Sequence, residues 1–237
     1  MYCLFAGAYP TTLTVVNKCN HTVWPAISPR PTTPMLSTTG FALAPAESSI
    51  INIAIPPSWS GRLWARTLCA EDANRKFACV TGDCASSSME CDDGSATPPV
   101  TQAEFTINAS SGKDSFKVSY IQGFNLPIMI EPKDGNGIGE CTTVGCEVDL
   151  NSLCPSEVQV MRRSDCVACK NLCQSSGGSK YCKFFTDACP LANVDAAKIF
   201  QGICASTNYL ITFCATTASK RLVLTVVFAA TEYGELI

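Results

Sequence analysis

Cysteine offers more chemistry than any other residue type in this chain. The sequence of 237 residues contains 16 cysteines, an even number spread over nearly its whole length. Such a count indicates either disulfides formed in an oxidising compartment or a metal held by thiolates. Zinc sites need several close Cys pairs or added histidines, whereas this chain has one histidine, His21, and one short spacing, from Cys166 to Cys169. We therefore predict disulfides, and we expect neither a metal site nor a cofactor.

The same short spacing is also that of a redox-active Cys-x-x-Cys motif. Redox chemistry needs a βαβ setting and a helix N-terminus that lowers the pKa of the thiol. Asp165 is a suitable N-cap for a helix that continues to Cys173, and Cys166, Cys169 and Cys173 would then share one face. No βαβ pattern surrounds this segment, so we expect these cysteines to form structural disulfides with partners elsewhere in the chain.

The charge pattern argues against one class of partner. The chain has 17 basic and 20 acidic residues, and no basic run is longer than the pairs Arg162-Arg163 and Lys220-Arg221. Nucleic acid binding therefore has no electrostatic basis in this sequence. Charged residues make up only 16% of the chain, so serine, threonine, asparagine and glycine must provide much of the surface. Such a surface suits contact with sugars.

Short strands must position these residues. Segments rich in β-branched and aromatic residues, bounded by proline, glycine, asparagine or serine, predict strands at 12–16, 50–55, 62–67, 104–108, 116–121, 126–130 and 209–213. Their spacing favours a mainly β fold, either a sandwich or a flattened barrel. The only clear helical pattern is at 165–173, inside a stretch from Cys141 to Cys189 that is dense in cysteine.

The two ends of the chain carry different signals. Residues 1–10 are apolar, and Ala6-Gly7-Ala8 has the form of a signal peptidase site, although no basic residue precedes it. We interpret 1–10 as a truncated signal peptide. The apolar stretch 222–230 is far shorter than the roughly 20 residues that span a bilayer. We therefore expect 215–237 to be a tail, with no transmembrane insertion.

Several sequence blocks carry a family resemblance. The run from Phe77 to Cys84, FACVTGDC, followed by Cys91, is similar to the signature of thaumatin-like proteins, the pathogenesis-related type 5 family. Other similar blocks follow in family order: NKC at 17–19, SGRLWART at 60–67, AEFT at 103–106, GFNLP at 123–127, CPSE at 154–157 and YC at 181–182. The resemblance covers nearly all of residues 11–214.

This resemblance implies one thaumatin-like domain over 11–214. Its parts are a flattened β-sandwich, a small loop lobe at about 70–97, a disulfide-rich lobe of helix and loops at about 141–189, and a cleft between the sandwich and the latter lobe. It also implies seven disulfides: Cys19–Cys214, Cys69–Cys79, Cys84–Cys91, Cys141–Cys204, Cys146–Cys189, Cys154–Cys169 and Cys173–Cys182.

Two cysteines, Cys3 and Cys166, have no assigned partner in this scheme. They could join each other if the N-terminus is retained. If it is cleaved, Cys166 is a free thiol or competes with Cys169 for Cys154. The family's usual second cysteine next to Cys182 is absent here, together with its partner.

The family lines its cleft with an arginine, a glutamate and three aspartates, and the acidic pair resembles a weak glucan hydrolase site. Arg62 and Glu104 match the first two positions, Lys117 and Gln122 replace two aspartates, and Asp195 is the candidate for the third. Glycoside hydrolysis normally needs a carboxylic acid and a second carboxylate. A lysine beside Glu104 also favours its ionised form, whereas a general acid must be protonated. We therefore predict polysaccharide binding with hydrolysis absent or vestigial.

Several of these residues also suit a purely structural role. Arg62 could form a structural salt bridge with Glu104, and Gln122 could be a turn residue. Trp64 is more typical of a core than of a sugar platform. Asp83 suits a tight turn in which its side chain accepts hydrogen bonds from its own backbone.

The leading hypothesis is a secreted, monomeric, antifungal defence protein of the plant type. It would bind cell-wall β-glucan or disturb fungal membranes, and would lie outside the cell in the apoplast or the wall. Glycosylation sequons at Asn20 and Asn108 are typical of such a protein. The alternatives are a weak endo-β-1,3-glucanase using Glu104 and Asp195, and a stress-induced scaffold without a cleft function.

Overall fold

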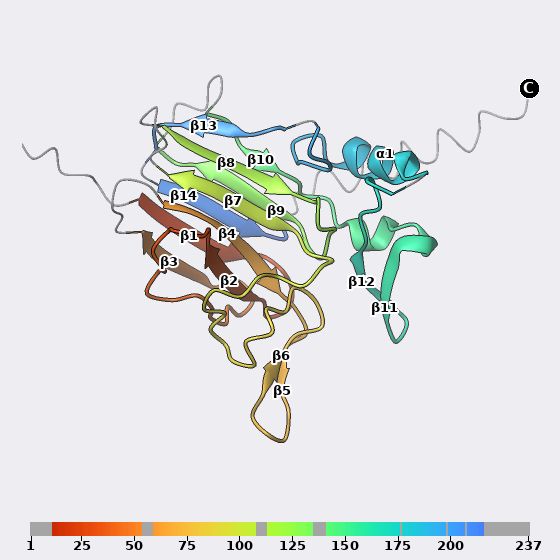
Figure 1. Cartoon of the computed structure of the whole chain (residues 1–237), viewed down its shortest axis with the longest axis horizontal. Helices are drawn as coiled ribbons and strands as arrows, with labels where there is room; N and C mark the ends of the chain where they lie inside the picture. The colour runs from red at the N-terminus through yellow and green to blue at the C-terminus, as the bar shows by residue number, and fades with distance from the viewer. Residues whose placement is uncertain are drawn as a thin grey trace, which may run out of the picture.

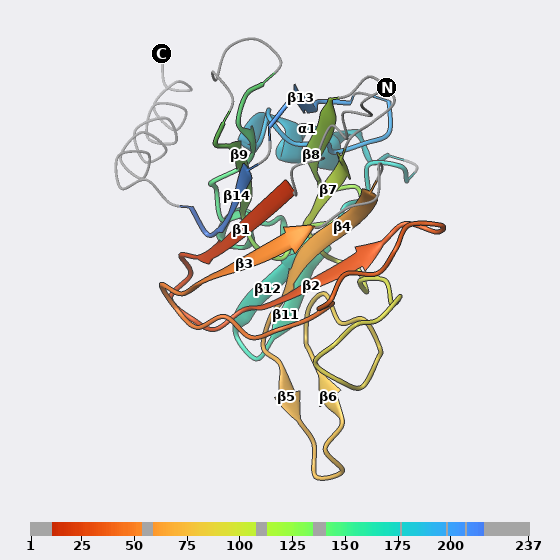
Figure 2. The same cartoon turned by 90° about the vertical axis from the view of Figure 1, so that its left-hand side faces the viewer.

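Two five-stranded sheets stacked face to face form the centre of the molecule (Figures 1 and 2). This computed structural model describes residues 11–53, 59–107, 113–134, 141–175, 177–197, 199–206 and 208–215. The first sheet has, in spatial order, β10 (Val144–Gly145), β9 (Ile128–Pro132), β14 (Asn208–Phe213), β1 (Thr11–Asn17) and β3 (Ser48–Ile53). The second has β13 (Gly202–Cys204), β8 (Asp114–Ser119), β7 (Gln102–Ile107), β4 (Trp59–Arg66) and β2 (Trp24–Pro29). The predicted β-sandwich is confirmed.

The core lies between the two sheets and follows from the alternation of side chains along each strand. In β1, buried and half-buried residues alternate, and Leu13 is fully enclosed. The rings of Phe105, Phe116 and Tyr209 meet between the sheets with centroids 5.1 to 6.3 Å apart. Such pairs add about 0.5–1.5 kcal/mol each beyond their apolar burial. The hydroxyl of Tyr209 donates a 2.7 Å hydrogen bond to buried Asp114, so the polar end of this ring is satisfied inside the core.

All seven predicted strands coincide with observed strands, to within a few residues at their ends. Residues 54–55 and 108, at the ends of two predicted strands, lie outside the described residues. β2 was not predicted, because Pro25 and Pro29 lie within it. The structure resolves this conflict by placing β2 at an edge of its sheet, where a missing backbone donor can face away from the ladder.

The helix predicted at 165–173 is wrong. β11 (Gln159–Arg162) and β12 (Asp165–Cys169) form an antiparallel hairpin instead. The backbone of Cys169 exchanges hydrogen bonds of 2.8 and 2.9 Å with Phe124, next to the sandwich, and this pairing holds the segment extended. Tertiary pairing therefore overrides the local N-cap signal of Asp165. The α-helix lies downstream as α1 (Ser179–Ala188), after two short 3₁₀ helices at Leu150–Leu153 and Ser156–Val158.

Seven disulfides staple the fold, and they join the pairs that the family resemblance implies: Cys19–Cys214, Cys69–Cys79, Cys84–Cys91, Cys141–Cys204, Cys146–Cys189, Cys154–Cys169 and Cys173–Cys182. In the part of the chain that the structure describes, Cys166 is the one free cysteine. The predicted signal peptide at 1–10, with Cys3, the sequon at Asn108 and the tail beyond residue 215 lie outside this part.

A long loop segment covers one end of the outer face of the second sheet. It contains the small hairpin of β5 (Ala70–Glu71) and β6 (Phe77–Ala78), which projects from the sandwich in both views (Figures 1 and 2). Beneath the loop, Trp64, Ala26 and Val100 form a second buried cluster with the Cys84–Cys91 disulfide. Because this loop covers one end, only part of the outer face is open to ligands. Among the described residues, no helix is long and apolar enough to cross a membrane.

Candidate functional site

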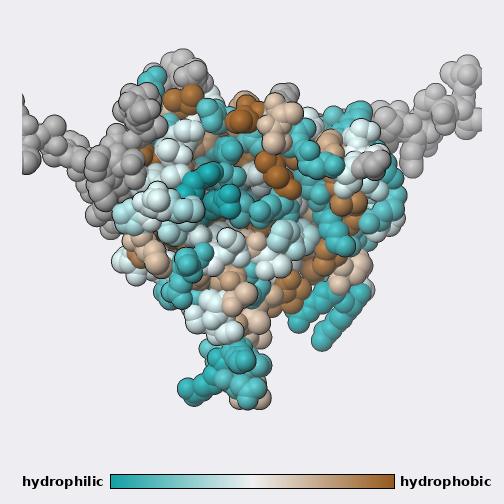
Figure 3. Space-filling view, in the orientation of Figure 1, coloured by the Kyte–Doolittle hydropathy of each residue, from teal (hydrophilic) through white to brown (hydrophobic). Residues whose placement is uncertain are grey.

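A row of charged side chains crosses the second sheet. The ladder places Arg62 of β4 opposite Glu104 of β7, and Glu104 opposite Lys117 of β8. Directly opposite residues project from the same face of a sheet. Their neighbours along each strand are buried between the sheets, so the row lies on the outer face. Figure 3 shows strongly hydrophilic residues gathered over this part of the face. Three of the predicted site residues are therefore brought together.

Glu104 is held by two cations. Its Oε2 accepts a 2.8 Å hydrogen bond from Arg30 and lies 3.7 Å from Nζ of Lys117. The Glu104 side chain is only 11% exposed, against 47% for Arg30 and 24% for Lys117. Arg30 follows β2, and its amide donates to the carbonyl of Ser60 at 2.8 Å, which places it at the edge of β4. Its guanidinium reaches across β4 to the carboxylate.

The structural salt bridge considered as one role for Arg62 does not form, because Arg30 pairs with Glu104 instead. Arg30 was not predicted, because the prolines around it concealed β2. Arg62 is half-buried, its Nε is buried without a hydrogen-bond partner, and it forms no ion pair within the described ranges. We call Arg30, Arg62, Glu104 and Lys117 the charged row. It holds three cations and one carboxylate, so its net charge is positive.

The other two predicted cleft residues lie where β8 ends. Gln122 follows the strand in a turn, its carbonyl accepts from the amide of Val100 at 3.1 Å, and its Oε1 is buried without a partner. Asp195 comes two residues after Asn193, whose β-bridge to Ser119 attaches this loop to the end of β8. The Oδ1 of Asp195 accepts from the amide of Ala197 at 2.9 Å. Both residues thus lie toward one end of the strand whose middle carries Lys117.

Two structural interpretations from the sequence are confirmed. Trp64 is fully buried, and its Nε1 donates to the carbonyl of Gly82 at 2.7 Å, so it belongs to the core and not to a sugar platform. The carboxylate of Asp83 accepts from the amides of Cys79 and Ala85, both at 2.6 Å, which closes a tight turn.

The charged row supplies charged groups that can contact a ligand. Glu104 is the only carboxylate of the charged row, and it forms ion pairs with Arg30 and Lys117. In the ranges the structure covers, no cluster of three or more histidine, cysteine, aspartate or glutamate residues could hold a metal. The charged row therefore offers cationic donors and one acceptor to a ligand.

The single histidine, His21, does not belong to this row. Burial lowers the pKa of His21, an effect that Asp149 partly offsets, and its Nδ1 lies 2.9 Å from Oδ1 of Asn20.

Comparisons with known proteins agree on one family. A model of the Thaumatin family matches residues 17–206. The PR5-like receptor kinase of Arabidopsis thaliana is 39% identical over 232 residues, which are 88% of this chain but only 35% of the kinase. The chain thus spans about a third of that relative. A Prunus avium protein named glucan endo-1,3-beta-glucosidase is 38% identical over 89% of this chain and 93% of its own length.

One further relative supports the same grouping, and one solved structure shares the fold. Thaumatin-like protein 2 of Prunus persica is 39% identical over 89% of this chain and 93% of its own. Among solved structures, the thaumatin-like xylanase inhibitor TLXI superposes with a TM-score of 0.51 and 24% identity, over 85% of this chain and 98% of the inhibitor. The latter likeness shows the shared fold.

Proposed function

This chain belongs to the thaumatin family, and we propose that it is a defence protein that holds cell-wall polysaccharide, β-glucan included, without efficient catalysis. The observation that carries this proposal is that Glu104 lies among cations. Glycosidases normally place a second carboxylate roughly 5 to 9.5 Å from the first. Here the neighbouring strands present Arg62 and Lys117 instead, and Arg30 and Lys117 contact the carboxylate.

Two assays on the purified protein test this function. In sedimentation with insoluble β-glucan, we expect the protein to bind, and we expect Lys117→Asp and Gln122→Asp to change the bound fraction. Lys76→Gln, an exposed lysine on the β5–β6 hairpin, is the control that should leave binding unchanged. In a reducing-sugar assay on laminarin, we expect no turnover above background. A protein that fails to sediment, or whose binding ignores both variants, would be a scaffold without a cleft function.

The second candidate is a weak endo-β-1,3-glucanase that uses Glu104 and Asp195. The name of the Prunus avium relative favours it. Laminarin turnover that disappears in both Glu104→Gln and Asp195→Asn would establish this alternative and refute the first proposal. Turnover that survives Glu104→Gln would point to a contaminating enzyme.

The proposal includes secretion into the apoplast. Seven disulfides form readily only in an oxidising compartment. Asn20 is exposed and begins the sequon Asn20-His21-Thr22, so we also propose that it carries an N-linked glycan. Intact mass after expression through a plant secretory pathway should fall by one glycan in Asn20→Gln. An unchanged mass would exclude Asn20 as a glycan site.

A further inference from the structure

Within the described residues, the three cations of the charged row have ion pairs with one carboxylate only, so the row carries a surplus of positive charge. Arg30 and Lys117 both contact the single carboxylate of Glu104. Arg62, between Glu104 and β2, has no acceptor among the residues that the structure covers. An unsatisfied buried donor costs on the order of 1–3 kcal/mol, and a bound acceptor would recover this cost. The surplus therefore makes the row a place where an anion binds favourably.

A row of hydroxyl groups lies beside the charged row. The same ladders place Ser60 opposite Thr106, and Thr106 opposite Ser115, two residues along each strand from the charged positions. All three are half-buried, and the hydroxyls of Ser60 and Thr106 lie 3.2 Å apart. Two residues along a strand are about 7 Å. One face of the sheet thus presents cationic and hydroxyl groups in two rows about 7 Å apart.

We propose that the charged row recognises the carboxylates of an acidic polysaccharide, and so prefers a uronic acid polymer over a neutral glucan. A guanidinium presents paired donors that match a carboxylate in geometry as well as charge. Arg62 supplies the free guanidinium, and Lys117 and Arg30 add charge on either side. The hydroxyl row contacts the sugar hydroxyls of the same chain. This inference rests on the proposed function and names the class of polysaccharide.

The direction in which one substitution changes the binding affinity distinguishes carboxylate recognition from neutral sugar binding. When the row holds an acidic ligand, Glu104 competes with that ligand for Arg30 and repels its carboxylates. Glu104→Gln should therefore tighten the binding of an acidic oligosaccharide several-fold. If Glu104 instead accepts hydrogen bonds from sugar hydroxyls, the same substitution should weaken binding, because an amide oxygen is a poorer acceptor than a carboxylate.

Isothermal titration with three matched probes tests the proposal: oligogalacturonate, the same oligosaccharide fully methyl-esterified, and laminarin oligosaccharides of equal length. We expect oligogalacturonate to bind at least about tenfold more tightly than its ester, and this preference to shrink as salt screens the charges. Arg62→Gln, which removes no contact described in the folded protein, should reduce the affinity for oligogalacturonate by about tenfold. Lys76→Gln removes one positive charge from the distant hairpin and should leave the affinity for oligogalacturonate unchanged.

Each result has a defined meaning. Equal binding of the acid and its ester, or an affinity indifferent to Arg62→Gln, overturns the proposal. Inorganic phosphate is titrated as a fourth probe. If it binds as tightly as oligogalacturonate, the proposal is also overturned, because the row would then be a site for small anions only. Retained β-glucan binding without a preference for the acid refutes this inference but keeps the proposed function. Loss of binding to every polysaccharide refutes both.

Discussion

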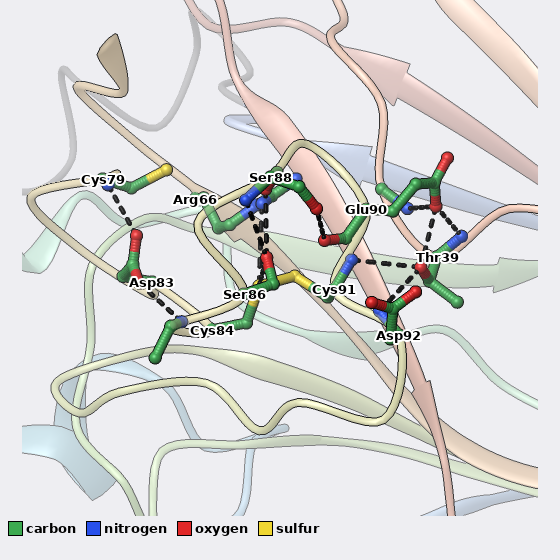
Figure 4. Close-up of a disulfide and its surroundings, with 12 residues drawn as sticks. Thr39, Arg66, Cys79, Asp83, Cys84, Ser86, Ser88, Glu90, Cys91 and Asp92 are labelled. Carbon is green, nitrogen blue, oxygen red and sulfur yellow. Dashed lines mark hydrogen bonds between the residues drawn. A yellow bond between two sulfur atoms is a disulfide. The ribbon is translucent and has the colours of Figure 1, made fainter. Parts of the chain in front are cut away.

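The guanidinium of Arg66 donates a 2.6 Å hydrogen bond to the carbonyl of Met89, and this bond ties the end of β4 to the loop that carries the Cys84–Cys91 disulfide (Figure 4). Arg66 is fully buried and also donates to the carbonyl of Trp24 at 3.2 Å. Its guanidinium lies 5.1 Å from the centre of the Phe77 ring. Burial lowers the pKa of Arg66 to about 10, against the opposing effect of Asp83 and Glu90, so the side chain remains charged at neutral pH.

Substitution of this arginine should therefore destabilise the protein more than loss of an exposed charge. Arg66→Ala removes a buried guanidinium and leaves the carbonyls of Met89 and Trp24 without this donor, and we expect the free energy of unfolding to fall by about 3 kcal/mol or more. Arg75→Ala, on the exposed hairpin tip, should cost less than about 0.5 kcal/mol. Urea unfolding under non-reducing conditions measures both. Equal costs would show that Arg66 is not a structural tie.

The carboxylate of Glu90 makes the stability of the protein depend on pH. Burial raises the pKa of Glu90, but hydrogen bonds from Thr39, Thr38 and Gly40 together outweigh it and leave the pKa below its ordinary value. The amide and hydroxyl of Thr39 lie 2.5 and 2.7 Å from Oε2, and the amide of Gly40 lies 2.7 Å from it (Figure 4). A lowered folded pKa means that the stabilisation is complete above the unfolded pKa of about 4.3 and disappears as pH falls through the folded value.

We therefore expect Glu90→Gln to reduce the free energy of unfolding at pH 7 and to have little effect well below the folded pKa of Glu90. Denaturant titrations at several pH values from neutral down into the acid range measure this difference. A cost that is the same at every pH would mean that Glu90 contributes by shape and not by its charge.

The sequence predicted most of the sandwich because its strands alternate strongly. β1 alternates buried and half-buried residues along its whole length, and no proline interrupts it. β2 and the hairpin of β11 and β12 escaped prediction for opposite reasons. The prolines of β2 oppose a strand locally, and Asp165 favours a helix locally. In β2 the pairing with β4 decides the structure, and in β12 the pairing of Cys169 with distant Phe124 does so.

The site was predicted only as far as the family resemblance reached. Arg62, Glu104 and Lys117 were placed by matching motifs, and the ladder then brought them together. Arg30 could not be found in this way, because its contact with Glu104 spans 74 residues of sequence. Its role depends on the position of β2 at the sheet edge, which no local pattern encodes.

Removal of single disulfides should show a strong dependence on loop length. According to the chain-entropy treatment, a bridge stabilises by limiting the unfolded chain, and more so for a longer loop. Cys19–Cys214 closes a loop of 195 residues and Cys84–Cys91 closes one of 7. This treatment gives about 5 kcal/mol for the former and about 2 kcal/mol for the latter. Denaturant unfolding of the two double alanine variants measures both costs, and a larger cost for the short loop would contradict this ranking.

The thiol of Cys166 provides the last prediction. Cys166 is half-buried in β12, its Sγ lies 3.4 Å from the carbonyl of Ala168, and burial, the largest of several influences, raises its pKa above the ordinary value. A raised pKa leaves little thiolate at neutral pH, so we expect iodoacetamide to label native Cys166 slowly and the rate to increase with pH beyond about 8.5. Peptide mapping locates the label, and Cys166→Ser is the control that must lose it. Recovery of Cys166 in a disulfide-linked peptide with Cys3, or with Cys154, would contradict a free thiol and would replace the pairing scheme at that point.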